Sequence, residues 1–594
     1  MKRCPECRRD YYDDTLLYCL DDGNALLEGP ATRDEPATAI LAEFGVPPLG
    51  GSSSESPTRA PIHTTDQTAI FPRGSEAESQ KNLGDLSERQ SLFAHQAAKP
   101  QAKVGGRHRQ LAGIGIAVLL LVAGFFGYLY FTPTKQIESI AVMPFQNASG
   151  SVDTEYLSDG ISEALINSLT ELQQLKVIAR STAFRYKGKE IDPQTVGREL
   201  SVGAVLMGRV RQVGDSLNVQ VDLVDAATGA QLWGKEYERK ASDVLSVKQA
   251  ITREVTENLK LRLSGEQQQQ LTKRDTTNPE AYQFYLRGRY FWNKRTADGI
   301  KKAVEEFQQA IDRDPNYALG YVGLADCYSI LNDYTGADGG AENAKAYAER
   351  ALQLDDSLAE AHASLASVYD NEWRWGDAER EFKRSIELNP NYPTARHWYG
   401  TFLRDAGRTD EAMAEMKRAQ ELDPLSPIIN QNVALLYVFQ GELDKAAEQY
   451  EKIIELNPSF PGAHAQLGFY VYLIQERFDD AIAKIHKGVD LSGRSSWLLA
   501  SLANAYGKAG KKDAALMVIQ ELLPRHEKHE ANEYVLAIAY AGLGDPDKVF
   551  VWLEKSFAAR SGSLRSIKTE FAFENTIRDD PRYADLVRRI GRNP

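Results

Sequence analysis

Cysteine is scarce in this chain, and its distribution limits how the chain can be stabilised. The sequence holds 4 cysteines among 594 residues, and three of them lie within the first 19 residues. A disulfide-rich secreted scaffold is therefore excluded, because such folds need several paired cysteines spread over the domain. The remaining one, Cys327, lies beside Leu324 and Tyr328, and we expect it to be a small core residue.

An excess of positive charge is also missing. The chain carries 70 basic and 83 acidic residues, which gives a formal net charge of -13. This balance argues against a general nucleic-acid binder, because phosphate contacts require clustered Lys and Arg. The length and the ordinary proportion of apolar residues instead indicate several globular domains.

Catalytic signatures are not evident either. Gly507 and Gly510, followed by two lysines, lack the spacing of a phosphate-binding loop, and we interpret them as a turn between helices. His526 and His529 are three residues apart, whereas a zinc-protease helix needs four, so we interpret them as part of a solvated helix face. Since no acid, base or nucleophile cluster stands out, we expect that the chain is not an enzyme.

The N-terminal segment holds a candidate zinc site. Cys4 and Cys7 form one knuckle, and Cys19 with Asp22 forms a second, in which aspartate stands in place of the fourth cysteine. Tetrahedral zinc needs four ligands, and a segment this short needs the metal in order to fold. We therefore predict a zinc ribbon over residues 1–27, with Asp21 or a water as alternatives to Asp22. The run resembles the ribbons that open many bacterial membrane-associated regulatory proteins.

A linker and an apolar segment follow. Residues 28–110 are rich in Pro, Gly, Ser, Thr and charge without a sustained period, which predicts a disordered linker. Residues 111–131 contain no charged side chain and would cover about 31 Å as a helix, so we expect one transmembrane helix. Lys135 alone stands close on the C-terminal side, and the cations on the N-terminal side are Lys99, Lys103, Arg107 and Arg109. The positive-inside rule then places the N-terminus in the cytoplasm of a single-pass inner-membrane protein, with extracytoplasmic C-terminal domains.

Alternating strand and helix signals follow the predicted span. Asp192 and Pro193 are typical of the N-cap and first position of a helix, and Gly214 with Asp215 marks a hairpin. We expect strands at 137–145, 175–179, 204–213, 217–225 and 231–237, and helices at 153–172, 193–200 and 242–263. Residues 137–264 are thus predicted to form one α/β domain.

This domain contains four specific strings, SIAVMPFQNASG, DGISEALINSL, KVIARSTAFRYKGK and DAATGAQLWGKEYER. They resemble the N-terminal domain of TolB and its relatives over nearly all of residues 137–263. The resemblance implies an interaction module that has no catalytic residues to carry over. The propeller that follows this domain in TolB is absent here, so the resemblance supports a docking role alone. Related regulatory chains place the domain between a membrane span and helical repeats, the order predicted here.

The C-terminal half repeats with a period of 34 residues. Tyr369, Leu403, Tyr437, Tyr506 and Tyr540 recur at multiples of 34 with one single-residue slip. This period is typical of tetratricopeptide repeats, in which two helices form each repeat and neighbouring repeats share one core. We predict an all-α solenoid of about eight repeats over residues 278–560, followed by an amphipathic cap at 561–594.

In such arrays the first helix of each repeat lines a concave groove. Fixed positions in the repeat should face a bound segment, and counting them gives Asp370, Asn371, His397, Arg404, Gln431, Phe439, Phe469, Tyr472, Trp497 and Asn504. The polar side chains suit an extended peptide backbone, and aromatic side chains are the usual anchors of protein interfaces. The alternative is that these aromatics fill the packing between repeats.

Together these features favour a multidomain bacterial membrane scaffold or sensor that binds protein partners, with zinc as its cofactor. An alternative is a membrane-linked transcriptional or kinase-pathway regulator that acts through the cytoplasmic ribbon. Nucleic acid is not an expected partner, because acidic residues surround the four cations of the ribbon. These cations are Lys2, Arg3, Arg8 and Arg9. A third possibility is an enzyme with a cryptic site in the α/β domain. The sequence leaves the partner and the oligomeric state open.

Overall fold

A computed structural model gives the fold. It describes Lys2–Arg3, Asp10–Tyr11, Leu27–Glu28 and residues 137–261, 263–265, 267–268, 276–335 and 340–591. In these residues no helix is both long and apolar enough to cross a membrane. The span predicted at 111–131, most of the linker and the predicted zinc ligands Cys4, Cys7, Cys19 and Asp22 lie outside them, so these remain predictions. The chain divides into two compact units, Met1–Gly105 and Gly106–Pro594.

The described residues of the first unit form a small antiparallel sheet. β1 (Lys2–Arg3) pairs with β2 (Asp10–Tyr11) on one side and with β3 (Leu27–Glu28) on the other. In the sequence both Cys4 and Cys7 fall between β1 and β2. Strands this short cannot form an independently stable sheet, so the ribbon interpretation still requires a stabilising metal. Within the described residues, no group of three or more His, Cys, Asp or Glu side chains could hold one.

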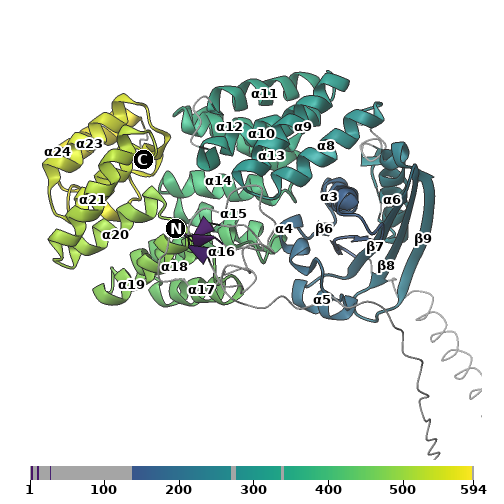
Figure 1. Ribbon diagram of the computed structural model, residues 1–594, viewed down its shortest axis with the longest axis horizontal. Coiled ribbons are helices and arrows are strands. Elements are labelled where there is room, and N and C mark those ends of the chain that lie inside the picture. Colours follow the sequence, from purple (N-terminus) through teal and green to yellow (C-terminus); the bar gives the residue numbers. More distant parts are fainter. Residues whose placement is uncertain are drawn as a thin grey trace, which may run out of the picture. The chain divides into compact units, whose positions relative to one another are not determined.

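The second unit begins with an α/β domain built on a mixed sheet (Figure 1). The strands β4 (Ser139–Val142), β6 (Lys176–Val177), β7 (Ala204–Val213), β8 (Ser216–Asp225) and β9 (Gln231–Lys240) lie in the order β6-β4-β7-β8-β9. β4 runs parallel to β6 and β7, whereas β8 is antiparallel to β7 and β9. The short β5 (Gln146–Asn147) also pairs with β7 in parallel. The domain therefore joins a parallel half to an antiparallel meander.

Helices cover both faces of this sheet. α3 (Glu155–Thr170) and α6 (Val244–Asn258) share one core with strand residues such as Ile140 and Val219. The opposite face packs Ala141 and Val205 against α5 (Pro193–Leu200). A short α4 (Arg180–Ala183) follows β6. The layers are those expected when a sheet must bury both apolar faces.

Local signals predicted most of these elements correctly. The side chain of Asp192 accepts a hydrogen bond from the N–H of Thr195 at 3.0 Å, which confirms the predicted N-cap of α5. Four elements are shorter than predicted, namely β4, β6, α3 and α6. The first strand ends at Val142, and the last helix of the domain ends at Asn258 rather than at residue 263. Lys260 has a φ of +56°, a left-handed conformation that a continuing helix does not allow.

The described residues that follow this domain form mainly helix pairs (Figure 1). The described residues form eight pairs: α8 (Pro279–Trp292) with α9 (Ala297–Arg313), α10 (Ala318–Thr335) with α11 (Gly340–Leu354), α12 (Ala359–Asn371) with α13 (Trp375–Leu388), α14 (Pro393–Asp405) with α15 (Thr409–Leu422), α16 (Pro427–Phe439) with α17 (Leu443–Leu456), α18 and η4 (Pro461–Gln466 and Leu467–Tyr472) with α19 (Phe478–Leu491), α20 (Ser496–Lys508) with α21 (Lys512–Glu527), and α22 (Glu533–Gly542) with α23 (Pro546–Ala558). α24 (Pro581–Ile590) follows them. We number these pairs as repeats one to eight.

The predicted core cysteine and the predicted turn are both confirmed. Cys327 is fully buried in α10, and burial raises the pKa of its thiol. Gly510 lies between α20 and α21 with a φ of +75°, so this run is the turn between two helices of one repeat.

The first helix of repeat six contains a π-helical turn, η4, between Leu467 and Tyr472. The N–H of Leu473 donates to the carbonyl oxygen of Gly468, five residues back, at 3.0 Å. A π turn of this kind accommodates one extra residue in an α-helix. Tyr437 and Tyr506 are separated by one residue more than two periods. The slip in the sequence repeat is therefore this π turn.

Candidate peptide-binding groove

The first helices of repeats three to seven form the inner face that the sequence predicted as a groove. Chain from the far C-terminus covers part of this face. Arg565 donates a hydrogen bond to Asn371, and its Nε lies 3.7 Å from a carboxylate oxygen of Asp370. The ring of Phe571 stacks on Phe439, with 5.2 Å between ring centroids. Three of the predicted groove residues, Asp370, Asn371 and Phe439, thus contact the protein's own C-terminal segment.

A chain of polar side chains connects α14 and α16. Arg404 donates to the Asn432 oxygen at 2.6 Å, and the Asn432 amide nitrogen lies 3.1 Å from Nε2 of His397. Burial, together with the positive charge of Arg404, lowers the pKa of His397 to about 4, so the ring is neutral near pH 7 and Nε2 accepts this hydrogen bond. Arg404 also binds Asp405 at 2.7 Å. His397 and Arg404 therefore both contact Asn432, and these side chains already have partners within the protein.

Three more of the predicted residues belong to the packing between repeats. Asn504 is fully buried and donates to the carbonyl oxygen of Ile538 at 2.9 Å. Phe469 is 6% exposed and Tyr472 is also buried, and both belong to the largest core cluster. For Tyr472 the structure favours the packing alternative, and the polar Asn504 is buried between repeats as well. A register error of one residue is enough to move a helical side chain from the groove to the core.

Gln431, Phe469 and Trp497 come together at a hollow between the first helices of repeats five, six and seven. This pocket has a volume of about 220 Å³ and lies between α16, α18 with η4, and α20. Its lining is uncharged and comprises Gln431, Gly462, Ala465, Gln466, Phe469, Tyr470, Trp497, Leu498 and Ser501. Trp497 is 38% exposed and stacks on Tyr534 with a ring-centroid separation of 6.2 Å. The indole ring of Trp497 therefore lines the pocket while it is held in place by stacking on Tyr534.

Gln431 supplies the main polar feature of the pocket. Its side chain is 7% exposed, and its Oε1 atom has no hydrogen-bond partner among the described residues. A buried acceptor without a donor costs about 1–3 kcal/mol, so such a group calls for an explanation, and a bound water or a ligand donor would provide one. The pocket thus combines an unpaired acceptor with the aromatic side chains of Trp497 and Phe469, an arrangement suited to an uncharged group that carries an N–H or O–H donor.

Sequence reasoning missed six of the nine residues that line the pocket, namely Gly462, Ala465, Gln466, Tyr470, Leu498 and Ser501. Counting positions at a fixed period of 34 gives wrong positions wherever the helix contains an extra residue, and η4 is such a place. The single-residue slip in the repeat was the available signal, because π turns are frequently found at functional sites.

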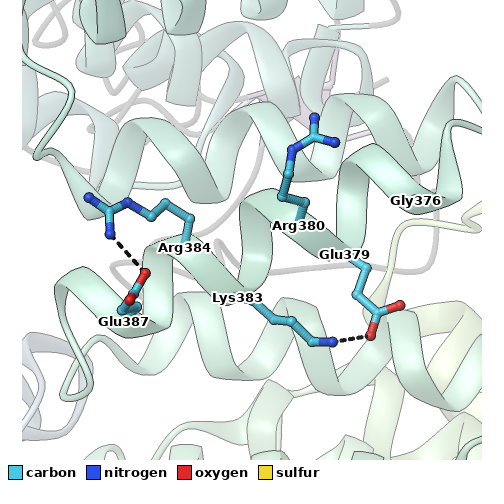
Figure 2. Close-up of a pocket in the computed structure, with 6 residues that line it drawn as sticks. All are labelled: Gly376, Glu379, Arg380, Lys383, Arg384 and Glu387. Carbon is cyan, nitrogen blue, oxygen red and sulfur yellow. Dashed lines mark hydrogen bonds and ion pairs between the residues drawn. The ribbon is translucent and has the colours of Figure 1, made fainter.

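A larger hollow of about 640 Å³ follows the exposed side of α13, but its chemistry is different (Figure 2). All of its lining residues come from this one helix. Figure 2 shows Lys383 paired with Glu379 and Arg384 paired with Glu387. The nitrogen–oxygen distances of these two pairs are 2.8 and 2.7 Å. Paired charges on one exposed helix are typical of a solvated surface. We therefore do not treat it as a ligand site.

The repeats also bind the α/β domain through the string ARSTAFR. The hydroxyl groups of Ser181 and Thr182 both donate to the carboxylate of Asp423, the latter at 2.7 Å. Arg185 donates to the side-chain oxygen of Asn457 at 2.6 Å. From the repeat side, the amide of Asn391 donates to the carbonyl oxygen of Leu175 at 3.0 Å. This surface of the domain is thus occupied within the chain.

Comparison with known proteins identifies the helix pairs. Two tetratricopeptide-repeat family models match, at residues 365–427 and 429–460, which span the described repeats three to five. The helix pairs are tetratricopeptide repeats. The predicted all-α tetratricopeptide solenoid is therefore confirmed. This fold suggests protein or peptide partners for this half of the chain.

Two further similarities concern the α/β domain and the chain as a whole. A model of the HilA/YgeH-like transcriptional regulator, second domain, matches residues 135–254. The TolB-like assignment of this domain stays a prediction. The putative adenylate cyclase 3 of Rhizobium meliloti (strain 1021) is 32% identical over 244 residues, which are 41% of this chain and 42% of that protein. The chain thus spans less than half of the length of this curated relative.

Solved tetratricopeptide structures resemble parts of the chain. YrrB, described as a TPR protein with an unusual peptide-binding site, is 24% identical, with a TM-score of 0.24 over 32% of this chain and 93% of YrrB. PilW, a type IV pilus biogenesis factor, is 21% identical, with a TM-score of 0.30 over 35% of this chain and 94% of PilW.

Proposed function

We propose that this protein is a single-pass bacterial membrane scaffold or sensor whose tetratricopeptide repeats bind a peptide segment of a protein partner. The observation that carries the proposal is the pocket at Gln431, Phe469 and Trp497. It lies on the inner face of the repeats and is lined by Gln431, whose buried amide oxygen has no donor in the part of the chain that the structure describes. Aromatic side chains that close such pockets commonly supply much of the binding energy in protein interfaces. The proposed role is binding, and it includes no catalytic step.

Selection of a phage-displayed random peptide library on the full chain tests this function. We expect the selected peptides to lose at least about tenfold in affinity on Trp497→Ala, which corresponds to about 1.4 kcal/mol. Leu516→Ala is the matched control, because Leu516 is exposed to a similar degree, 39%, on α21 and does not line the pocket. Peptides that bind both variants as well as the natural chain would place binding elsewhere.

The membrane placement is the second part of the proposal. It is supported by the uncharged run at 111–131 and its basic N-terminal flank. A cysteine at Ser75 should resist a membrane-impermeant thiol reagent in intact cells or spheroplasts, and one at Gly339 should react. The reverse labelling pattern would overturn the proposed localisation, in which the repeats and the TolB-like domain are extracytoplasmic.

The ribbon is proposed to hold one zinc through Cys4, Cys7, Cys19 and Asp22. Metal analysis of a peptide of residues 1–30 under reducing conditions tests this set of ligands. We expect one zinc per peptide, and a loss of affinity for Cys19→Ser, because each thiolate is one of few ligands. Unchanged affinity in that variant would rule out the ribbon.

A membrane-linked regulator is the second candidate function. It is favoured by the similarity of the α/β domain to a domain of transcriptional regulators and by the adenylate-cyclase name of the relative. In this function, binding of a partner to the repeats would change how the cytoplasmic ribbon interacts with its own cytoplasmic partner. Titration of fluorescent duplex DNA with the zinc-loaded peptide of residues 1–30 tests whether such a regulator acts by binding of the ribbon to DNA. We expect no binding at physiological salt, because the segment's acids offset its cations.

A further inference from the structure

The segment of residues 560–578, which we name the C-terminal clasp, joins the two ends of an array of six repeats. Arg565 lies on the inner face near both Asp370 of repeat three and Asp405 of repeat four, at 3.7 and 3.5 Å. Phe571 contacts Phe439 of repeat five at 5.2 Å and Tyr470 of repeat six at 5.6 Å. One short segment thus touches the first helices of four successive repeats.

Further contacts connect repeat three directly to the end of the chain. The rings of Trp373 and Phe557 lie 5.6 Å apart, and the guanidinium of Arg560 lies 5.5 Å from the Trp373 ring. The indole N–H of Trp375 donates to the carbonyl oxygen of Ile590 at 3.4 Å. Repeat three is therefore held against repeat eight and α24, although 184 to 215 residues separate the paired groups in the sequence.

The two sides of the clasp differ in how firmly they are held. Leu564, Ile567, Phe573 and Ile577 are buried in the core shared with α20, α22 and α24. By contrast, the Arg565 side chain is 34% exposed, and Phe571, Trp373 and Phe439 are half-buried. Burial of apolar area dominates stability, so the core side of the segment is much more costly to detach than the side that faces repeats three to five.

We propose that the C-terminal segment is a clasp that closes the inner face of repeats three to five and opens without unfolding. When the contacts of Arg565, Phe571 and Trp373 separate, repeats seven and eight move away together with the segment, and the inner face with Asp370, Asp405 and Phe439 becomes accessible. The π turn η4 lies in repeat six, between repeats three to five on one side and repeats seven and eight on the other. A turn of this kind is a recognised place for a helix to bend. A partner on this face would then compete with the protein's own segment.

A disulfide can report whether the clasp is closed. A Cβ atom on residue 562 would lie 3.5 Å from the Cβ atom of Asn371, which is within the range of disulfide geometry. In the full chain, Asn371→Cys with Gly562→Cys should therefore cross-link rapidly under mild oxidation. The cross-link is followed by the mass of the joined proteolytic peptides, because the natural cysteines also react.

The decisive variant adds Arg565→Glu and Phe571→Ala to this cysteine pair. We expect cross-linking to slow at least about tenfold, with the melting temperature of the chain nearly unchanged. An unchanged cross-linking rate would show that these side chains do not hold the clasp. A large fall in melting temperature would show that the segment is inseparable core, and it too would overturn the proposal. Arg588→Glu, on α24 and 74% exposed in its side chain, is the control for an added negative charge. None of these outcomes depends on whether the pocket at Gln431 binds a peptide.

Discussion

Gln431 and Gly462 lie so close together that a Cβ atom on residue 462 would come within 2.1 Å of the Gln431 amide oxygen. Glycine in the first turn of α18 therefore leaves room for this buried acceptor. Gly462→Ala should displace the amide oxygen from the pocket. Alanine favours the helix by about 1 kcal/mol over glycine, which offsets part of the strain.

We accordingly expect Gly462→Ala to weaken selected peptides several-fold while urea unfolding changes by less than about 1 kcal/mol. Gly376→Ala is the matched control, because Gly376 is also in the first turn of a helix, α13, and an added Cβ atom there meets nothing within 4 Å. Equal peptide affinities for the two alanine variants would show that the Gln431 acceptor takes no part in binding.

The two aromatic residues of the pocket should behave differently when truncated. Phe469 is 6% exposed within the core, so Phe469→Ala should cost about 3–5 kcal/mol in the free energy of unfolding. Trp497 is 38% exposed, and Trp497→Ala should cost about 1–2 kcal/mol. Urea denaturation measures both values. If Trp497→Ala proves as destabilising as Phe469→Ala, the indole is a core residue and its loss cannot be used to locate the ligand.

Glu570 should make the stability of the clasp region depend on pH. Burial raises the pKa of this carboxyl to about 7, against the opposing effects of the Ala572 N–H and of Lys508, Arg404 and Arg578. The folded chain therefore keeps this proton between about pH 4.5 and 7, where the unfolded chain has already lost it. Stability from this group is present below about pH 4.5 and is lost as the pH rises towards 7.

Glu570→Gln should remove this loss. We expect the variant and the natural chain to match near pH 4, and the variant to be more stable at pH 8 by up to about 3 kcal/mol. Glu574→Gln, an exposed neighbour in the same segment, serves as the control. Parallel pH profiles for the natural chain and Glu570→Gln would contradict the raised pKa.

A buried ion cluster joins the α/β domain to the repeats at Glu163. Its carboxylate binds Arg180 and Arg289, each at 2.8 Å, and Asn293 donates to it at 2.8 Å. Burial would raise the pKa of Glu163, but the two arginines outweigh this effect and lower it. Glu163→Leu leaves the arginines without this partner, and removing one member of a buried pair costs about 3–5 kcal/mol.

Thermal and urea unfolding of Glu163→Leu should therefore show a large loss of stability. Asp298→Asn breaks the exposed pair with Lys302 and should change stability by less than about 0.5 kcal/mol. A small effect at Glu163 would show that the domain and the repeats do not depend on this cluster to stay together.

The sequence by itself determined the features that depend on neighbours along the chain. The cap at Asp192, the turn at Gly510 and the 34-residue period of the repeats each follow from local propensity or from the regular burial of one helix face. Even the π turn at Leu467–Tyr472 left a signal, as the single-residue slip between Tyr437 and Tyr506.

Only the tertiary structure decided which inner-face residues remain open. Asn371 and Phe439 look available in the sequence, yet Arg565 and Phe571 cover them from the far end of the chain. Such contacts have no sequence period, because they depend on how small rotations accumulate along the stacked repeats. Gln431 and Trp497 likewise share a pocket although they lie two repeats apart, because the stacking of repeats five to seven brings their helices together.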